Sequence, residues 1–286
     1  MSTSTPVSRR ATRMLRRAPI WLLVAVLLVI VGYPLIWLLL GSFKSQREFL
    51  EAPTWALPEQ WNFDNYIVAW DTAGLGQSLF NSAITVLPSL FLMLLLGTAA
   101  AFALEVLVWK GRNGVLIIFL AGIMVPTQMI LLPLFSTYFQ LGLTGSLWPL
   151  IITYTATGLP LTVFLMATYF RAIPREVFEA ATLDGASIYR QFFSIALPMM
   201  KNGLFTVGLV QFFFFWNDLL IALTFANSGS LRTLQVGLLN FNGQFGTTQY
   251  GPLFAAISIN VFALLIIYLV LNQRIQKGLT AGAVKG

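Results

Sequence analysis

The sequence predicts an all-α integral membrane protein with six transmembrane helices and both chain ends in the cytoplasm. Three observations support this fold class. Of the 286 residues, 57% are hydrophobic and 9% are charged, whereas about a quarter of the residues in a soluble domain are charged. The apolar residues form stretches long enough to cross a bilayer, which takes about 20 residues in a helix. The Lys and Arg residues are concentrated in alternate loops between these stretches.

The spans are placed where charged residues are missing. The longest charge-free stretch, residues 113–170, is long enough for two spans, and Gly142, Gly145 and Pro149 mark a turn that divides it. The fifth span contains one charge, Asp218. In chain order, the six predicted spans are Ile20–Leu40, Leu79–Leu104, Val115–Tyr138, Leu147–Phe170, Leu204–Phe225 and Pro252–Leu271. Together they form a transmembrane domain over residues 19–272.

The basic residues predict the orientation of the spans. All but three of the 17 Lys and Arg residues lie in the two chain ends and in the loops after the second and fourth spans, and the exceptions are Lys44, Arg47 and Arg232. Because Lys and Arg accumulate in cytoplasmic loops, both ends are expected in the cytoplasm. The net charge of +7 therefore indicates membrane anchoring, and no nucleic-acid partner is expected. We expect residues 1–18 to form a disordered cytoplasmic tail and residues 273–286 a second cytoplasmic tail.

Two long segments, 41–76 and 226–251, are predicted on the outer side. They contain Trp and Tyr residues that suit a membrane interface, and they are also large enough to meet an extracellular partner. Both interpretations stay open.

The composition excludes several kinds of chemistry. The chain has no Cys and no His, so it has no disulfide, thiol nucleophile, imidazole base or Ser-His-Asp triad. We therefore expect no catalytic residues and no metal site.

The cytoplasmic loop that follows the fourth span has a helical pattern of its own. Pro174 suits the first position of a helix, and Glu176 and Glu179 follow where carboxylates favour the positive helix end. Gly185 is expected to end this helix. A second helix is expected from Ser187 to just before Pro198, because the residue before a proline is disfavoured in a helix.

The first of these helices is expected to be amphipathic. Pro174, Phe178 and Ala181 would share one face. Ala180 and Ala181 would leave the helix slim enough to enter a cleft, and Glu179 would offer a carboxylate to an Arg of another protein. The alternative is an ordinary surface helix.

The same loop resembles the EAA loop of ABC-importer permeases of the carbohydrate-uptake group, which includes the maltose-type permeases. The matching residues are Ile173-Pro174-Arg175-Glu176, Glu179-Ala180-Ala181, Asp184-Gly185-Ala186 and Leu197-Pro198, and further matches are Trp216-Asn217-Asp218, Arg232-Thr233-Leu234 and Gly278 to Gly286. One departure is the sixth span, which has Asn260-Val261-Phe262 where a proline is expected.

The resemblance implies the type I ABC-importer permease fold, with residues 171–202 as a cytoplasmic coupling loop that contacts an ATPase. The residues expected to make or shape this contact are Pro174, Glu176, Glu179, Ala180, Ala181, Asp184, Gly185, Leu197 and Pro198. The implied partners are an ABC ATPase dimer, a second homologous permease and an external sugar-binding protein. The chain has no GxxxxGK[ST] phosphate loop, so ATP and Mg are expected on the ATPase and no cofactor on this chain. The implied location is the cytoplasmic (inner) membrane of a bacterium or archaeon.

The implied substrate is a mono- or oligosaccharide. Asp218 is the one ionisable residue deep in a predicted span, where a carboxylate facing lipid costs at least about 2.5 kcal/mol. We therefore expect it to face a substrate pathway together with Gln211, Trp216 and Asn217, since amides, carboxylates and aromatic rings are suited to bind sugars. The alternative is that Asp218 only ends a helix.

Two other functional classes fit the sequence less well. An ion-coupled secondary transporter would need several intramembrane carboxylates and usually an internal repeat. A membrane enzyme would need a catalytic cluster, and we find none in the sequence.

Overall fold

The computed structural model describes residues 7–72, 74–241 and 247–283, and the regular structure of these residues is helical. The prediction of an all-α protein is therefore confirmed. The chain divides into two compact units. The first contains the residues up to Thr72 together with Phe241–Phe262, and the second contains residues 74–240 and the chain from Ala263 onward.

Four helices in the described part of the chain are long and apolar enough to cross a membrane by themselves. Their membrane-crossing segments are Pro19–Gly41 in α1 (Val7–Gly41), Leu75–Glu105 as α4, Trp148–Arg171 as α7 and Tyr250–Leu271 in α14 (Tyr250–Ala283). They coincide with the predicted first, second, fourth and sixth spans. Two bent helix pairs bring the number to six if each pair is counted as one span.

The predicted third span is a broken helix. It consists of α5 (Arg112–Ile123) and α6 (Thr127–Gln140), which meet at 96°. The break lies at Pro126, which has an extended backbone with ψ of 121°. Proline has no N–H to donate and disfavours helical backbone in the residue before it, so the predicted third span is not one continuous helix.

The predicted fifth span, Leu204–Phe225, is also not continuous. Helix α11 (Lys201–Trp216) ends before Asp218, and the short helix α12 (Leu220–Phe225) follows. At its other end, α11 forms the second bent pair with residues 188–199, at an angle of 73°.

Helix continues into both predicted tails. Because α1 begins at Val7, the expectation of disorder was wrong for residues 7–18. Helix α14 continues to Ala283, beyond its membrane-crossing segment, and the division into a transmembrane domain and two tails stays a prediction. The last matched residues of the tail, 284–286, lie outside the described part of the chain.

In the first unit, a segment of short helices follows α1. It contains α2 (Gln46–Glu51), α3 (Asp64–Ile67) and the π-helical turn η1 (Val68–Thr72). Ser45 and Glu48 form a capping box at α2, and the Glu48 carboxylate also accepts a hydrogen bond of 2.7 Å from the Glu59 amide. Burial acts to raise the pKa of Glu48, but the hydrogen bonds from Ser45 and Glu59 outweigh it and hold that pKa below its usual value.

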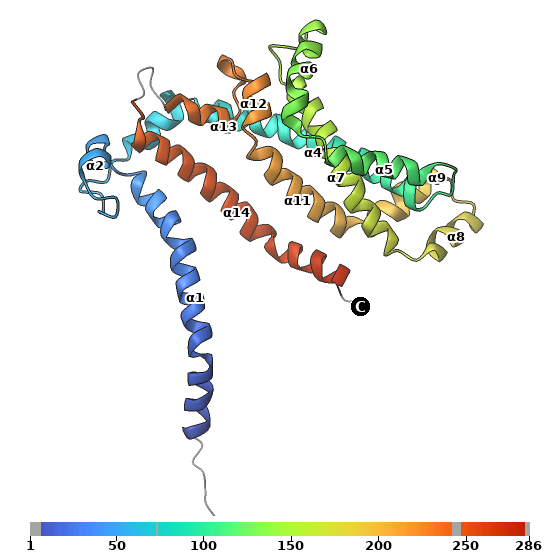
Figure 1. Cartoon of the computed structure of the whole chain (residues 1–286), viewed down its shortest axis with the longest axis horizontal. Coiled ribbons are helices and arrows are strands. Elements are labelled where there is room, and N and C mark those ends of the chain that lie inside the picture. Colours follow the sequence, from blue (N-terminus) through green and yellow to red (C-terminus); the bar gives the residue numbers. More distant parts are fainter. Residues whose placement is uncertain (1–6, 73, 242–246, 284–286) are drawn as a thin grey trace, which may run out of the picture. The chain divides into compact units, whose positions relative to one another are not determined.

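In the second unit, α4 and α7 pack against each other, and both contact α5 and α11 (Figure 1). A small residue allows the close approach: a Cβ added at Gly158 of α7 would lie 2.5 Å from Met93 Sδ and 2.8 Å from Phe215 Cζ. A buried cluster contains Phe102, Phe170, Phe178 and Phe192, so it joins the long loop after α7 to the ends of α4 and α7.

Three further short elements follow α12 in this unit. They are the 3-10 helix η3 (Gly229–Leu231), the helix α13 (Leu234–Gly237) and the 3-10 helix η4 (Leu238–Phe241), whose last residue is assigned to the first unit. Asn81 of α4 holds this segment by donating to the carbonyl oxygens of Ser230 at 2.6 Å and Arg232 at 2.9 Å.

Candidate functional sites

The coupling loop begins with the predicted amphipathic helix. This helix is α8 (Arg175–Leu183), so Pro174 is its N-cap and not its first helical residue, a shift of one position from the prediction. Pro174 has an extended backbone with ψ of 135°, and Glu176 lies in the first turn. A carboxylate at this position stabilises the helix through the partial positive charge of its N-terminus.

Gly185 ends α8 as predicted. Its φ of +72° lies in the left-handed region, which glycine adopts without steric cost. The Gly185 amide donates to the Thr182 carbonyl at 3.0 Å, and the Ala186 amide donates to the Ala181 carbonyl at 2.9 Å. These two bonds are the Schellman motif, which satisfies the last carbonyl groups of a helix. Asp184, at the C-cap, is exposed.

The second helix of the loop does not end before Pro198. It begins after Ser187, whose hydroxyl accepts a hydrogen bond from the Arg190 amide, and it continues as α9 (Ile188–Arg190), the π-helical segment η2 (Gln191–Ala196) and α10 (Leu197–Met199). The wider π turns directly before Pro198 relieve the clash that proline makes in an ordinary α-helix. The prediction that the second helix ends before Pro198 was therefore wrong.

The coupling loop is held to the spans by its apolar face. Phe178 and Ala181 are buried, as predicted, whereas Pro174 is exposed. The Phe178 ring lies 5.8 Å from the Phe102 ring of α4. Gln191 is buried, and its Nε2 donates to Thr182 Oγ1 at 3.0 Å and to the Ala186 carbonyl at 3.1 Å. The two helices of the loop are thus joined to each other and to α4.

The opposite side of the coupling loop is exposed and partly apolar. Glu179 and Ala180 are exposed, and the neighbouring Leu183 and Tyr189 are 89% and 78% exposed. Large apolar side chains beside a carboxylate on an open surface are typical of a protein-docking site. Sequence reasoning missed Leu183 and Tyr189, although an apolar residue on the polar side of an amphipathic helix was a usable signal.

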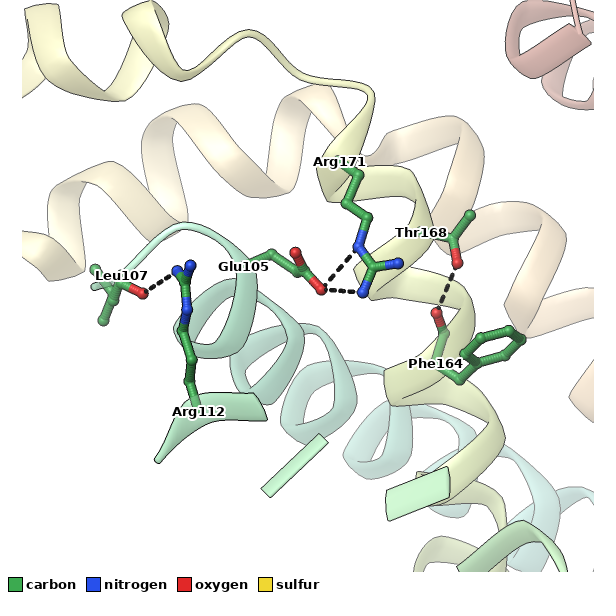
Figure 2. Close-up of polar contacts among 6 residues, drawn as sticks. All are labelled: Glu105, Leu107, Arg112, Phe164, Thr168 and Arg171. Carbon is green, nitrogen blue, oxygen red and sulfur yellow. Dashed lines mark hydrogen bonds and ion pairs between the residues drawn. The ribbon is translucent and has the colours of Figure 1, made fainter. Parts of the chain in front are cut away.

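An ion pair that sequence reasoning also missed lies beside the coupling loop (Figure 2). Arg171, the last residue of α7, donates from Nε at 3.0 Å and from Nη2 at 2.6 Å to one carboxylate oxygen of Glu105, the last residue of α4. Arg112 Nη1 donates to the Leu107 carbonyl at 3.1 Å. A cavity of about 520 Å³ lies between this pair and the coupling loop, and both Arg175 and Glu179 line it.

We expect reversal of this ion pair to weaken transport modestly. Arg171→Glu would place two carboxylates together and loosen the start of the coupling loop. Since Arg171 is half exposed, the loss in uptake should be about two- to fivefold, as expected for a partly solvated pair. The double variant Glu105→Arg with Arg171→Glu should recover most of the uptake. A double variant that transports no better than Arg171→Glu would contradict a role for the pairing itself.

A cleft of about 570 Å³, with a mostly apolar lining, lies between α5, α6, α7, α11 and α12 in the second unit. Gln211 and Asp218 line it, as two of the four residues predicted for the substrate pathway. Trp216 and Asn217 do not line it. Trp216 packs its ring 5.3 Å from that of Phe212, and Asn217 donates to the Phe213 carbonyl at the end of α11. The other polar residues of the cleft are Thr127, Tyr138, Thr153, Tyr154 and Thr157.

Asp218 both lines the cleft and ends a helix. Its carboxylate accepts hydrogen bonds from the Ala222 amide at 3.0 Å and the Ile221 amide at 3.4 Å, so it caps α12. It also accepts a hydrogen bond of 2.9 Å from the Tyr154 hydroxyl of α7. Asp218 therefore both ends a helix and lines this cleft, and its place in a substrate pathway stays a prediction.

Comparisons with known proteins agree with this architecture. Residues 93–280 match the family described as the binding-protein-dependent transport system inner membrane component. The chain is 36% identical to the diacetylchitobiose uptake system permease protein NgcG of Streptomyces coelicolor, over 90% of this chain and 85% of that protein. It is 30% identical to the melibiose/raffinose/stachyose import permease protein MelC of Bacillus subtilis, over 97% and 100% of the two chains.

A solved structure supports the fold. The crystal structure of a bacterial ABC transporter involved in the import of the acidic polysaccharide alginate includes a chain that matches with a TM-score of 0.78 and 20% identity, covering 96% of this chain and 99% of that one. From the family match, the curated relatives and the fold, this chain belongs to the family of binding-protein-dependent transport system inner membrane components, and it is a multi-pass permease of the ABC-importer type.

Proposed function

We propose that this chain is the permease subunit of an ATP-driven importer that carries a sugar delivered by an external binding protein. The coupling loop carries the proposal, because it places the exposed Glu179 carboxylate and the exposed Leu183 side chain on α8, whose other face is packed against α4, and the exposed Tyr189 side chain on the next helix, α9. The relatives named for uptake of diacetylchitobiose and of melibiose, raffinose and stachyose support a sugar as the substrate.

In this proposal, Glu179 forms a charge-assisted hydrogen bond with an Arg of the ATPase, and Leu183 and Tyr189 are buried beside it. Ala180 and Ala181 keep the helix slim, while Gly185 and the Schellman motif set the direction of the following segment. Closure of the ATPase pair on ATP would pull α8, and the packing of Phe178 against Phe102 would pass this motion to α4. Such a switch has two states, biased by ATP on one side and by the loaded binding protein on the other.

The proposed assembly contains two different permease chains and an ATPase dimer in the bacterial cytoplasmic membrane. ATP and Mg would be bound by the ATPase, which also performs hydrolysis. Substrate would pass Gln211 and Asp218 in the cleft between α6, α7 and α11, and Trp216 and Asn217 would contribute only if the cleft rearranges in another state.

Uptake by the reconstituted importer tests this function. The chain would be co-expressed with the ATPase, second permease and binding protein that neighbouring genes encode. The complex would be placed in proteoliposomes with diacetylchitobiose or melibiose outside. We expect uptake that needs ATP and the binding protein and that persists when an ionophore collapses ion gradients. Uptake that is lost with the ionophore while ATP is present would favour the ion-coupled transporter instead. Full activity of the purified chain by itself would contradict the assembly.

A further inference from the structure

The external segment that follows α1 exposes large apolar side chains close together in the sequence. Between residues 50 and 63, five such side chains have exposed fractions from 58% to 74%. They are Leu50, Trp55, Leu57, Trp61 and Phe63, and we call them the apolar surface. Exposed apolar side chains that gather in this way are typical of a face that contacts a partner protein or a membrane. The sequence by itself left both possibilities open for this segment.

This apolar surface belongs to a segment with a fixed fold. The Glu48 carboxylate, which caps α2, accepts a hydrogen bond from the Glu59 amide at 2.7 Å and so closes the chain between these two residues. The Asn62 amide donates to the Phe43 carbonyl at 3.0 Å. The Phe43 ring lies 5.1 Å from the Trp61 ring, edge to face. The exposed side chains are therefore presented by folded backbone directly after the end of α1.

The same segment is also tied to the start of α14, within the first unit (Figure 1). The Phe49 ring of α2 is stacked on Tyr250 at 5.4 Å and lies 4.8 Å from the Phe254 ring. Gln46 Nε2 donates to the Thr248 carbonyl at 2.8 Å, and Gln46 Oε1 accepts from the Tyr250 amide at 3.0 Å. The membrane-crossing segment of α14 begins at Tyr250. Helix α2 is thus fixed at the ends of two membrane-crossing helices, both on the predicted outer side.

A hydrogen bond sets the depth of the segment relative to the α1 span. Trp37 Nε1, in the last turns of the membrane-crossing segment Pro19–Gly41, donates to the Thr54 carbonyl at 2.8 Å. As a helix, Pro19–Gly41 is about 34 Å long, which is close to the hydrocarbon thickness of about 30 Å. The last turns of this segment, and the Thr54 backbone beside them, therefore lie at the edge of the hydrocarbon. Trp55, the next residue and 74% exposed, lies at the level of the lipid headgroups.

The charges of this segment indicate which force would hold it at a membrane. Residues 41–72 contain two basic and five acidic residues, and on α2 the exposed Arg47 is paired with Glu51 at 2.7 Å. Attraction to anionic lipids needs a cluster of Lys and Arg, which these residues do not form. Tryptophan, by contrast, is suited to the headgroup level, because its ring meets apolar chains while its N–H meets polar groups. Contact with lipid would therefore depend on apolar side chains and not on charge.

We propose that the apolar surface inserts into the outer leaflet at the level of the phospholipid headgroups and holds the outer ends of α1 and α14 at a fixed depth. A partner protein would approach from the water above the membrane, whereas the Thr54 backbone lies beside the last turns of α1, below that level. The bonds from Thr54 to Trp37 and from Gln46 to Tyr250 would pass the position of the inserted side chains to both spans. Such anchoring would depend neither on the transported substrate nor on ATP.

Spin labelling of the full chain in phospholipid vesicles tests the proposal. Because the sequence contains no Cys, each introduced Cys is the one site that takes the label. Trp55→Cys and Leu57→Cys would each carry a nitroxide, and Arg47→Cys is the matched control, since the charged Arg47 is exposed on the same segment. Collision rates of the label would be measured with oxygen, which concentrates in lipid, and with a water-soluble nickel complex. We expect a severalfold higher oxygen-to-nickel ratio at positions 55 and 57 than at 47, in neutral and in anionic vesicles alike.

Tryptophan fluorescence provides a second measurement that needs no label. The emission that Trp55→Phe removes should be the part quenched by phospholipids brominated near the headgroup, and not the part quenched by acrylamide in the water. Equal collision ratios at positions 47, 55 and 57, or removal of acrylamide-quenched emission, would overturn the proposal. Labels at 55 and 57 that become immobile only when the loaded external binding protein is added would also overturn it, and would identify this surface as a docking site for that protein.

Discussion

Replacing Glu179 with lysine should reduce ATP-driven sugar uptake by about a hundredfold while the protein stays in the membrane. Glu179 is exposed on α8, so the substitution creates no buried charge in the isolated chain. The loss of uptake arises where α8 docks on the ATPase, because the new ammonium group would face an Arg of that protein. Losing one partner of an interface charge pair typically costs about 2–5 kcal/mol.

Uptake in membrane vesicles, the amount of the chain in the membrane and co-purification of the ATPase would be measured together. Glu179→Gln keeps a hydrogen-bond acceptor and should fall between the unaltered chain and Glu179→Lys. Glu176→Lys, one turn earlier on the same helix, is the matched charge reversal and should reduce uptake only about twofold through the helix N-terminus. Normal uptake by Glu179→Lys would refute the proposed contact.

Replacing Gly185 with valine should have a still larger effect, because it should lower both uptake and the amount of folded protein. At a φ of +72°, a side chain costs roughly 1–2 kcal/mol, and a β-branched side chain is a true outlier. No atom lies within 4 Å of a Cβ built at this position, so the expected effect comes from backbone strain and not from a clash. Relief of that strain would break the two Schellman hydrogen bonds and move the second helix of the coupling loop.

Gly185→Asn is the matched control for this prediction, since asparagine tolerates left-handed backbone better than other non-glycine residues. It should retain most uptake and membrane abundance. Hydrogen exchange over residues 171–200 should rise in Gly185→Val and change little in Gly185→Asn. Equal loss in the two variants would show that the site requires the absence of any side chain, and full activity of Gly185→Val would show that the turn is unimportant.

Several features of the protein follow from local sequence alone. The spans at Ile20–Leu40 and Leu147–Phe170 are recognisable because a long apolar stretch has one stable solution in a bilayer, a helix with all its backbone groups paired internally. The turn at Gly185 and the buried face of Phe178 and Ala181 are likewise set by neighbouring residues. Turn formation and helical periodicity act over a few positions, so a single sequence carries them.

The tertiary structure alone decided how distant segments meet. The Glu105–Arg171 pair joins residues 66 positions apart. The cleft brings Tyr154 of α7 together with Gln211 and Asp218, which follow the coupling loop in the sequence. It also decided that Asp218, but not its neighbours Trp216 and Asn217, faces that cleft. Which side chain faces the cleft depends on how the helices pack against each other. Because α11 ends at Trp216, neighbouring residues at this break point toward different surroundings.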